Sequence, residues 1–136
     1  MRIFETHSED ETIAAGRKIA ALLPPRCVVL LDGTLGAGKT TITKRIAQAL
    51  GVDASEESSP TFTLIHEYGA RLAHVDLYRL ESDREFYTLG LEEYFDRPCI
   101  VLIEWGAKFR HLLPEDAIEL RIEHCGDDNR RIVVSR

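Results

Sequence analysis

Residues 33–40 read Gly-Thr-Leu-Gly-Ala-Gly-Lys-Thr, which is a complete GxxxxGK(S/T) phosphate-binding loop. The apolar, β-branched run at 27–31 before the loop is typical of a buried parallel strand. After the loop, 40–50 carries apolar residues at helical spacing and stops at Gly51. Strand, glycine loop and helix follow one another in the order that the motif requires, so the sequence predicts a site for a nucleoside triphosphate.

The glycines, the lysine and the first threonine of the loop have expected parts in this site. The three glycines let the chain curl so that successive backbone N–H groups point at phosphate oxygens. Lys39 can reach the β- and γ-phosphates, and the Thr40 hydroxyl can ligate Mg²⁺. The candidate nucleotide-binding residues of the loop are Gly33, Thr34, Leu35, Gly36, Ala37, Gly38, Lys39, Thr40 and Thr41.

Bulk composition limits the partners of such a site. A chain of 136 residues is expected to form one domain, 1–136, with a real core but little room for a separate substrate domain. Its net charge of −6 and its four lysines argue against a clustered positive face that could hold nucleic acid unaided. Any role at RNA is therefore expected to run through a protein partner.

The cysteines and the lengths of the apolar runs indicate in which cellular compartment the protein is expected. Cys27, Cys99 and Cys125 show no metal-binding spacing, and the first two each open an apolar strand run. We expect all three to be small core residues of a reduced, cytoplasmic protein. No apolar stretch approaches membrane-spanning length and the N-terminus has no signal-peptide pattern, so no membrane contact is expected.

Periodicity along the chain predicts a layered α/β domain of the P-loop NTPase type. Two fully apolar runs suit buried strands, and the alternating runs suit hairpins, so the central sheet is expected to be mixed parallel and antiparallel. The expected strands are 2–6, 27–31, 62–68, 71–78, 99–103, 117–124 and 131–135. The expected helices run from the capping box 8–11 to Pro24, over 40–50, over 82–95 with an interruption at Gly90, and around 106–112.

A phosphate-binding loop also needs a carboxylate for Mg²⁺ and a group that positions the attacking oxygen. Glu104 directly follows 99–103, at the carboxyl end of a buried strand, where α/β sheets place their ligands. Asp76 stands near the end of the second hairpin strand. Both are candidates for these tasks, and each could instead be a solvated turn residue.

Other segments could complete the site. The loop 58–63, Ser-Ser-Pro-Thr-Phe-Thr, could carry a hydroxyl to the γ-phosphate as a switch loop does, although such a run is more often only a loop. Arg79 could neutralise phosphate charge, but an ion pair with Asp76 or Glu81 is the favoured interpretation. Trp105 could form the floor of the site or merely pack.

Five segments together resemble one known family. They are GTLGAGKTT at 33–41, SPTFT at 59–63, HVDLYRL at 74–80, LGLEEYF at 89–95 and LIEW at 102–105, in the order and spacing of the TsaE (YjeE) family. The resemblance extends from the first helix to the last hairpin. It implies a small bacterial P-loop ATPase with a mixed sheet that acts in the synthesis of tRNA threonylcarbamoyladenosine (t6A).

The resemblance also implies partners and residue roles. Family members associate with two paralogous subunits, TsaD-like and TsaB-like proteins, to support threonylcarbamoyl transfer to adenosine 37 of tRNAs that read codons starting with A. The implied ligands are ATP and Mg²⁺, held by Lys39 and the loop glycines, Thr40 for the metal, Thr61 in the switch loop, Asp76 and Glu104 for Mg²⁺ and water positioning, and Trp105 beside the nucleotide. Thr34 departs from the family, which commonly has an acidic residue there, so no role is implied for this side chain.

Three other functions compete with a t6A ATPase. A small-molecule or nucleotide kinase shares the loop but needs an acceptor-binding segment and a lid, for which the chain has little room. A GTPase is disfavoured because guanine recognition normally uses an Asn-Lys-x-Asp segment, and the only asparagine, Asn129, is followed by Arg130. A nucleotide-gated assembly factor with incidental turnover stays open.

No motif marks the adenine pocket. The turn 7–9, Arg130 and Arg131 are its candidate walls.

Overall fold

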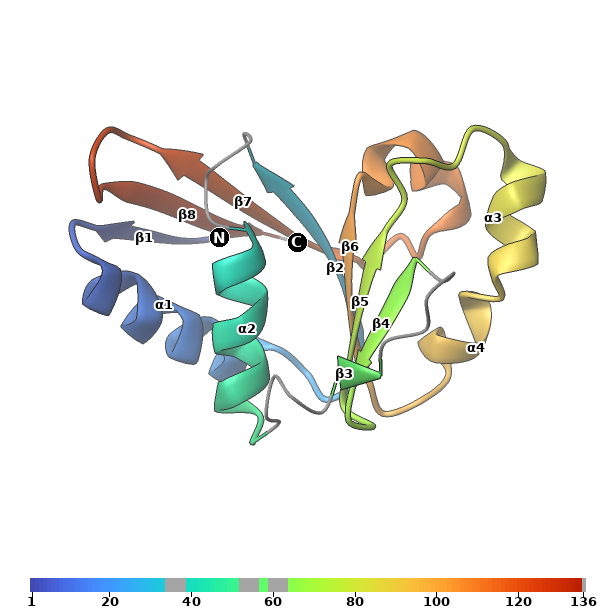
Figure 1. Ribbon diagram of the computed structural model, residues 1–136, viewed down its shortest axis with the longest axis horizontal. Coiled ribbons are helices and arrows are strands. Elements are labelled where there is room, and N and C mark those ends of the chain that lie inside the picture. The colour runs from blue at the N-terminus through green and yellow to red at the C-terminus, as the bar shows by residue number, and fades with distance from the viewer. Residues whose placement is uncertain (34–38, 52–56, 59–63, 136) are drawn as a thin grey trace.

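The computed structural model describes residues 1–33, 39–51, 57–58 and 64–135. These residues form an eight-stranded sheet in the order β1-β8-β7-β2-β6-β5-β4-β3 (Figure 1). The strands are β1 (Arg2–Thr6), β2 (Cys27–Gly33), β3 (Glu57–Ser58), β4 (Ile65–Tyr68), β5 (Leu72–Asp76), β6 (Ile100–Glu104), β7 (Ile118–His124) and β8 (Arg130–Ser135). The helices are α1 (Glu9–Leu22), α2 (Lys39–Ala49), α3 (Asp83–Leu89), α4 (Glu92–Phe95) and the 3₁₀ helix η2 (Gly106–Leu112).

The sheet is mixed, as predicted, and its parallel part lies at the centre. Strands β7, β2, β6 and β5 run parallel to one another, whereas β8 and β1 on one side and β4 and β3 on the other are added by antiparallel pairing. The two fully apolar runs of the sequence became β2 and β6, which lie next to each other in the middle. Their burial on both faces explains why neither run alternates with polar residues.

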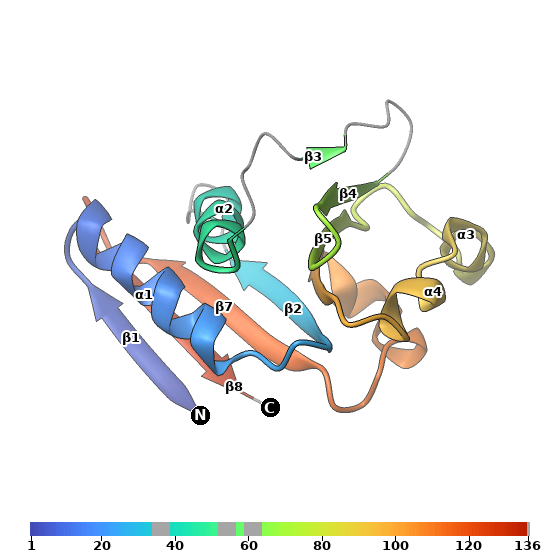
Figure 2. The same cartoon turned by 90° about the horizontal axis from the view of Figure 1, so that it is seen from below.

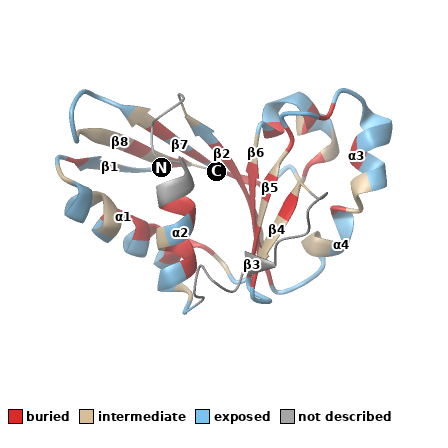
Figure 3. Ribbon diagram, in the orientation of Figure 1, coloured by how far each residue is buried: buried red, intermediate tan, exposed pale blue. Residues whose placement is uncertain are grey.

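Helices cover both faces of the sheet, and the sheet separates the core into two apolar layers. Figure 2 shows α1 and α2 together on one face, with α3 and α4 on the other. Under α1 and α2, Ile19, Ile42 and Ile46 pack against strand residues that include Leu102. On the opposite face, Phe86 of α3 belongs to a second apolar cluster with η2 and the alternate residues of the same strands. Buried residues therefore concentrate in the central strands and on the inner sides of the helices (Figure 3).

Short-range signals place the helix ends as the sequence predicted. The side chain of Ser8 caps α1 by accepting a hydrogen bond from the Glu11 N–H at 3.1 Å. Ser82 caps α3 in the same way, and Gly90 ends α3 with a left-handed φ of 73°. The helical segment 82–95 is thus two short helices, and the interruption at Gly90 is confirmed.

Two expectations were wrong in detail. Strand β5 ends at Asp76 and not at Tyr78, because the Leu80 N–H bonds to the Leu77 carbonyl and turns the chain. Cys99 is buried and Cys27 packs against the core, but Cys125 is exposed beyond the last residue of β7, where the hairpin turns. Within the described residues, no helix is long and apolar enough to cross a membrane.

Candidate nucleotide-binding site

The end of β2 and the start of α2 frame the phosphate-binding loop. Strand β2 ends at Gly33 and α2 begins at Lys39, so the predicted strand and helix are both present. Residues 34–38 lie outside the described residues, as do 59–63 with Thr61 and the side chains of 39–41. The first N–H groups of a helix have no acceptor within it and attract anions. This frame suits a phosphate group, and the parts of the individual loop residues stay predictions.

The two candidate carboxylates lie side by side at the same edge of the sheet. Asp76 and Glu104 are the last residues of β5 and β6, and the register pairs them directly. Glu104 is also paired with Leu31 of β2, two residues before that strand ends. Because β2, β6 and β5 are parallel, their carboxyl ends meet at one edge, which is also the edge where α2 begins.

The carboxylates also share the face of the sheet that α2 covers. Side chains at register-paired positions of parallel strands point to the same face, and every second residue of a strand does too. Leu31 and Leu102 lie in the apolar cluster under α2, so Glu104 and Asp76 are on that face. The sequence motifs and the register thus bring the phosphate-loop frame and both carboxylates together.

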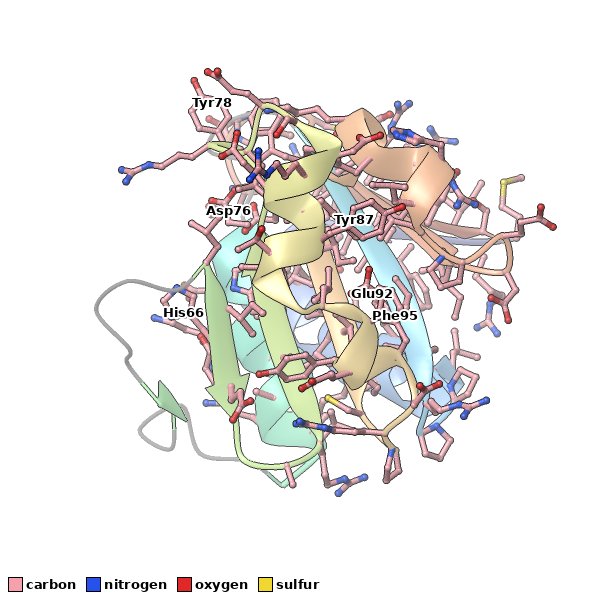
Figure 4. The ribbon with its side chains drawn as sticks, turned by 90° about the vertical axis from the view of Figure 1, so that its right-hand side faces the viewer. His66, Asp76, Tyr78, Tyr87, Glu92 and Phe95 are labelled. Carbon is pink, nitrogen blue, oxygen red and sulfur yellow. The ribbon has the colours of Figure 1, made fainter. Side chains whose placement is uncertain are left out.

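Each carboxylate is held by a hydrogen bond from β5 or the turn after it. The Tyr78 N–H donates to Asp76 Oδ1 at 2.9 Å. Nε2 of His74 donates to Oε2 of Glu104 at 2.6 Å. In Figure 4, Asp76 and Tyr78 lie toward one end of β5, and His66 lies lower, on the adjacent β4. The centroids of the His66 and His74 rings are 6.4 Å apart, so a histidine pair lies next to the carboxylates on this face.

His74 is the contact that the sequence prediction missed. It was recognised only as part of the segment HVDLYRL, and no role was assigned to its side chain. Its signal was its position two residues before Asp76 on a strand, which puts both side chains on one face.

The donor set at this edge fits Mg²⁺ held jointly with a nucleotide. Magnesium in nucleotide sites is bound by one or two carboxylates, with phosphate oxygens and water completing the shell. Asp76 and Glu104 supply two carboxylates in register. Among the described residues, no group of three or more His, Cys, Asp or Glu could hold a metal ion by itself. The arrangement therefore suits a shared metal and not an all-protein metal centre.

Trp105 turns the chain away from the site in an unusual backbone conformation. Its φ of 62° and ψ of 28° are left-handed, which is rare for a residue with a large side chain. The indole is 48% exposed, and its ring lies 4.9 Å from that of Tyr78. Lys108 of η2 holds this pair in place by donating to the Tyr78 carbonyl at 2.8 Å. The structure thus places Trp105 next to Glu104 but packs it against Tyr78.

Arg79 does not have the predicted ion pair. Among the described residues, no salt bridge joins Arg79 to Asp76 or Glu81. Asp76 is instead bonded to the backbone of the turn. The side chain of Arg79 is exposed at the same edge of the sheet.

A cavity of 710 Å³ adjoins the site on the other face of the sheet. Gly33 and Trp105 line it, together with residues of β7, β8 and β1. Four of its charged residues are paired across strands: Arg121 with Asp32 at 3.4 Å, and Arg131 with Glu123 at 3.7 Å. Exposed pairs of this kind contribute little to stability. The cavity borders the phosphate-loop frame, but it is separate from the face that carries the two carboxylates.

The candidate adenine walls do meet at the same edge as the loop. Thr6 at the end of β1 pairs with Arg130 at the start of β8, and Nδ1 of His7 lies 2.9 Å from Oδ1 of Asn129. Arg130 folds back onto the hairpin by donating to the Asp127 and Asn129 carbonyls. Arg131 lines the cavity on the other face. The turn 7–9 and Arg130 therefore stay candidates for a wall, and Arg131 faces away from them.

A separate polar cluster ties α4 to β4, on the face opposite the carboxylates. The Tyr94 hydroxyl donates to Oε1 of Glu67, and the Arg97 guanidinium lies 4.6 Å from the centre of the Tyr94 ring. Burial and the bond to Glu67 raise the pKa of Tyr94 to about 12. Burial likewise raises the pKa of the nearby Cys99 thiol. This cluster holds the helix to the sheet and lies outside the candidate site.

Comparisons with known proteins identify relatives over nearly the whole chain. A family model described as "Threonylcarbamoyl adenosine biosynthesis protein TsaE" matches residues 6–132. The tRNA threonylcarbamoyladenosine biosynthesis protein TsaE of Bacillus subtilis is 41% identical over 132 residues, covering 95% of this chain and 82% of that protein. The protein of the same name from Treponema pallidum is 37% identical, covering 96% of this chain and 97% of its own. A crystal structure of B. subtilis YdiB superposes with a TM-score of 0.76 at 35% identity, covering 98% of this chain and 84% of the other.

Proposed function

The chain belongs to the TsaE family of threonylcarbamoyl adenosine biosynthesis proteins, and from this premise we propose that it binds and hydrolyses ATP in support of t6A formation on tRNA. The observation that carries the proposal is the register of β5, β6 and β2. It aligns Asp76 and Glu104 with the end of the strand that leads into the phosphate-binding loop. A nucleotide bound at the loop would have its terminal phosphate on the side of both carboxylates.

Within this proposal, the loop residues bind the phosphates. The backbone from Gly33 to Gly38 and the N-terminus of α2 surround them, and Lys39 neutralises the β- and γ-phosphates. Thr40 supplies a hydroxyl ligand for Mg²⁺, next to Thr41. Thr61 in the switch loop senses the γ-phosphate, and Trp105 lies beside the nucleotide.

Asp76 and Glu104 divide the remaining work. Bound Mg²⁺ would neutralise charge on the β- and γ-phosphate oxygens. We assign Asp76, fixed by the Tyr78 N–H, to the metal. Glu104, fixed by His74, accepts a hydrogen bond from the attacking water and orients it in line with the bond to be broken. The water oxygen then forms a bond to the γ-phosphorus. At the same time the bond between the γ-phosphorus and the β-phosphate oxygen breaks, which gives ADP and phosphate.

We further propose that this activity serves a complex with TsaD-like and TsaB-like subunits in the cytoplasm. The net charge of −6 supports the view that the isolated chain does not hold tRNA itself. The described residues contribute to one continuous sheet, which supports a single ATPase domain over 1–136. An ATPase can drive a complex only if its ATP and ADP states bind the partner differently, so the association should depend on nucleotide.

The Glu104→Gln variant tests the proposed role of the carboxylate. Gln keeps the length of the side chain but removes its charge, so turnover of ATP should fall by about 10²-fold or more while ATP still binds. Glu119→Gln, on an exposed position of β7, is the matched control and should keep the wild-type rate. If binding and turnover fall together in proportion, Glu104 is a binding residue and the assignment is wrong.

Two alternatives differ from this proposal in a measurable way. A small-molecule kinase would transfer the γ-phosphate to an acceptor, and t6A would persist in cells depleted of this protein. A nucleotide-gated assembly factor would support t6A formation with a non-hydrolysable ATP analogue. A reconstituted reaction with both partners, supplied with ATP or the analogue, separates all three.

A further inference from the structure

His74 and Glu104 form a short polar contact at the candidate carboxylates. Nε2 and Oε2 are 2.6 Å apart, and the two side chains are only 13% and 12% exposed. His74 belongs to β5 and Glu104 to β6, so the bond crosses between neighbouring parallel strands. It joins positions that are thirty residues apart in the chain.

Glu104 has a particular need for such a bond. Its register partner is Asp76, so two like charges face each other at the edge of the sheet. A glutamate has three rotatable side-chain bonds and would turn away from that charge if nothing held it. A group that orients water must stay within about 0.5 Å of its working position. The imidazole of His74, fixed in the strand, can hold Glu104 there.

We propose that His74 is a positioning residue that fixes the Glu104 carboxylate for ATP hydrolysis, a role that rests on the proposed function. The imidazole donates one N–H to Oε2 of Glu104, and in this role the carboxylate also accepts a hydrogen bond from the attacking water. The bond requires only that Nε2 carries a hydrogen. His74 itself contacts neither water nor nucleotide in this role.

Two substitutions separate positioning from packing. His74→Leu keeps much of the volume and removes the donor, so kcat should fall about 10- to 100-fold, the usual effect of losing such a supporting bond. The KM for ATP and the affinity for a non-hydrolysable analogue should change less than about threefold. His74→Gln restores an N–H donor at a similar distance from the backbone and should recover a large part of kcat.

The fold offers a matched control outside the candidate site. Nε2 of His111 on η2 lies 3.0 Å from the Asp83 carboxylate of α3, and both side chains are more than half exposed. His111→Leu therefore removes a histidine–carboxylate pair without touching the candidate site, and kcat should stay at the wild-type value.

A second readout requires no catalysis. Melting temperatures of the nucleotide-free wild type, His74→Leu, Glu104→Leu and the double variant form a thermodynamic cycle, because a leucine at position 104 can accept no hydrogen bond from His74. If His74 holds Glu104, the shift of the double variant should differ from the sum of the single shifts, because both substitutions remove one bond. Additive shifts would overturn the proposal.

The kcat measurements can also contradict the proposal. A His74→Leu variant with wild-type kcat, or a His74→Gln variant as slow as His74→Leu, would contradict positioning. If wild-type protein with its partners does not hydrolyse ATP, the proposed function fails instead. The thermodynamic cycle still decides in that case whether His74 fixes Glu104.

Discussion

Neutralising Asp76 should make the nucleotide-free protein more stable, although this residue is proposed to hold the metal. Asp76 and Glu104 are direct register partners on adjacent strands, with both side chains on one face. Adjacent strands lie about 4.8 Å apart, so we take about 5 to 6 Å as the separation of the two charges. In Asp76→Asn, the amide oxygen can still accept the hydrogen bond from the Tyr78 N–H. The substitution therefore removes the charge and keeps the turn.

The size of the effect follows from the distance between the charges. Two unit charges about 5.5 Å apart repel by about 0.7 kcal/mol in bulk water and by about 3 kcal/mol at an effective dielectric constant near 20. Both side chains are partly exposed, and directly opposed like charges in sheets usually cost up to about 1 kcal/mol. We expect a gain of about 1 kcal/mol in the free energy of unfolding, or about 4 °C in melting temperature for a chain of this size.

The assay is urea and thermal unfolding at low ionic strength, with and without Mg-ATP. Without ligand, Asp76→Asn should be the more stable protein. With Mg-ATP the order should reverse or the gap should close, because the wild type gains binding free energy that the variant has lost. At 1 M NaCl the ligand-free difference should shrink, since the Debye length falls to about 3 Å.

Asp116→Asn is the matched control, because Asp116 is an exposed residue in the turn before β7. Its stability should stay within about 0.5 kcal/mol of the wild type with or without ligand. An Asp76→Asn variant that is equally or less stable than the wild type without ligand would refute the repulsion argument. A variant with unchanged stabilisation by Mg-ATP would remove Asp76 from the metal shell.

Three further predictions concern other parts of the chain. Lys39→Ala should lose ATP binding and hydrolysis while its circular dichroism spectrum stays that of the wild type; retained hydrolysis would contradict the loop assignment. Trp105 fluorescence should respond differently to ADP and ATP, because Trp105 follows Glu104 directly; identical spectra would count against this placement. The pKa of Tyr94 is raised to about 12, so its neutral form is favoured in the folded state and its contribution is lost as pH rises from about 10 to 12. Wild-type stability should fall more steeply over that range than that of Tyr94→Phe, and equal slopes would refute this assignment.

The sequence predicted those features that depend on neighbouring residues. The capping box at Ser8, the stop at Gly90 and the strand leading into Gly33 all came from local chemistry, and the structure confirms them. The hairpin of β4 and β5 could also be predicted, because its strands are joined by a short turn at 69–71. These signals act over a few residues, so a single sequence carries them in full.

Strand order could not be predicted in the same way. Placing β6 between β2 and β5 depends on how two apolar layers pack, and no local pattern in 99–103 specifies its neighbours. That placement makes Asp76 and Glu104 partners and brings His74 to Glu104. The candidate carboxylates were therefore predictable as strand-end residues, but the contact that fixes one of them was not.

Departures from ordinary local chemistry gather at this edge of the sheet and support its functional role independently of the loop motif. Asp76 and Glu104 set like charges opposite each other, and the next residue, Trp105, has a left-handed backbone, which costs about 1–3 kcal/mol outside glycine. Among the other described residues, left-handed positions are taken by glycines and by Asp127, an aspartate in a hairpin turn, where the conformation is well tolerated. Elsewhere the caps and turns follow ordinary local chemistry. The opposed charges at Glu104 and the left-handed backbone at Trp105 both cost stability, and they stand at adjacent positions. Binding a cation and a nucleotide would offset that cost, which is the arrangement expected of a site shaped for a ligand.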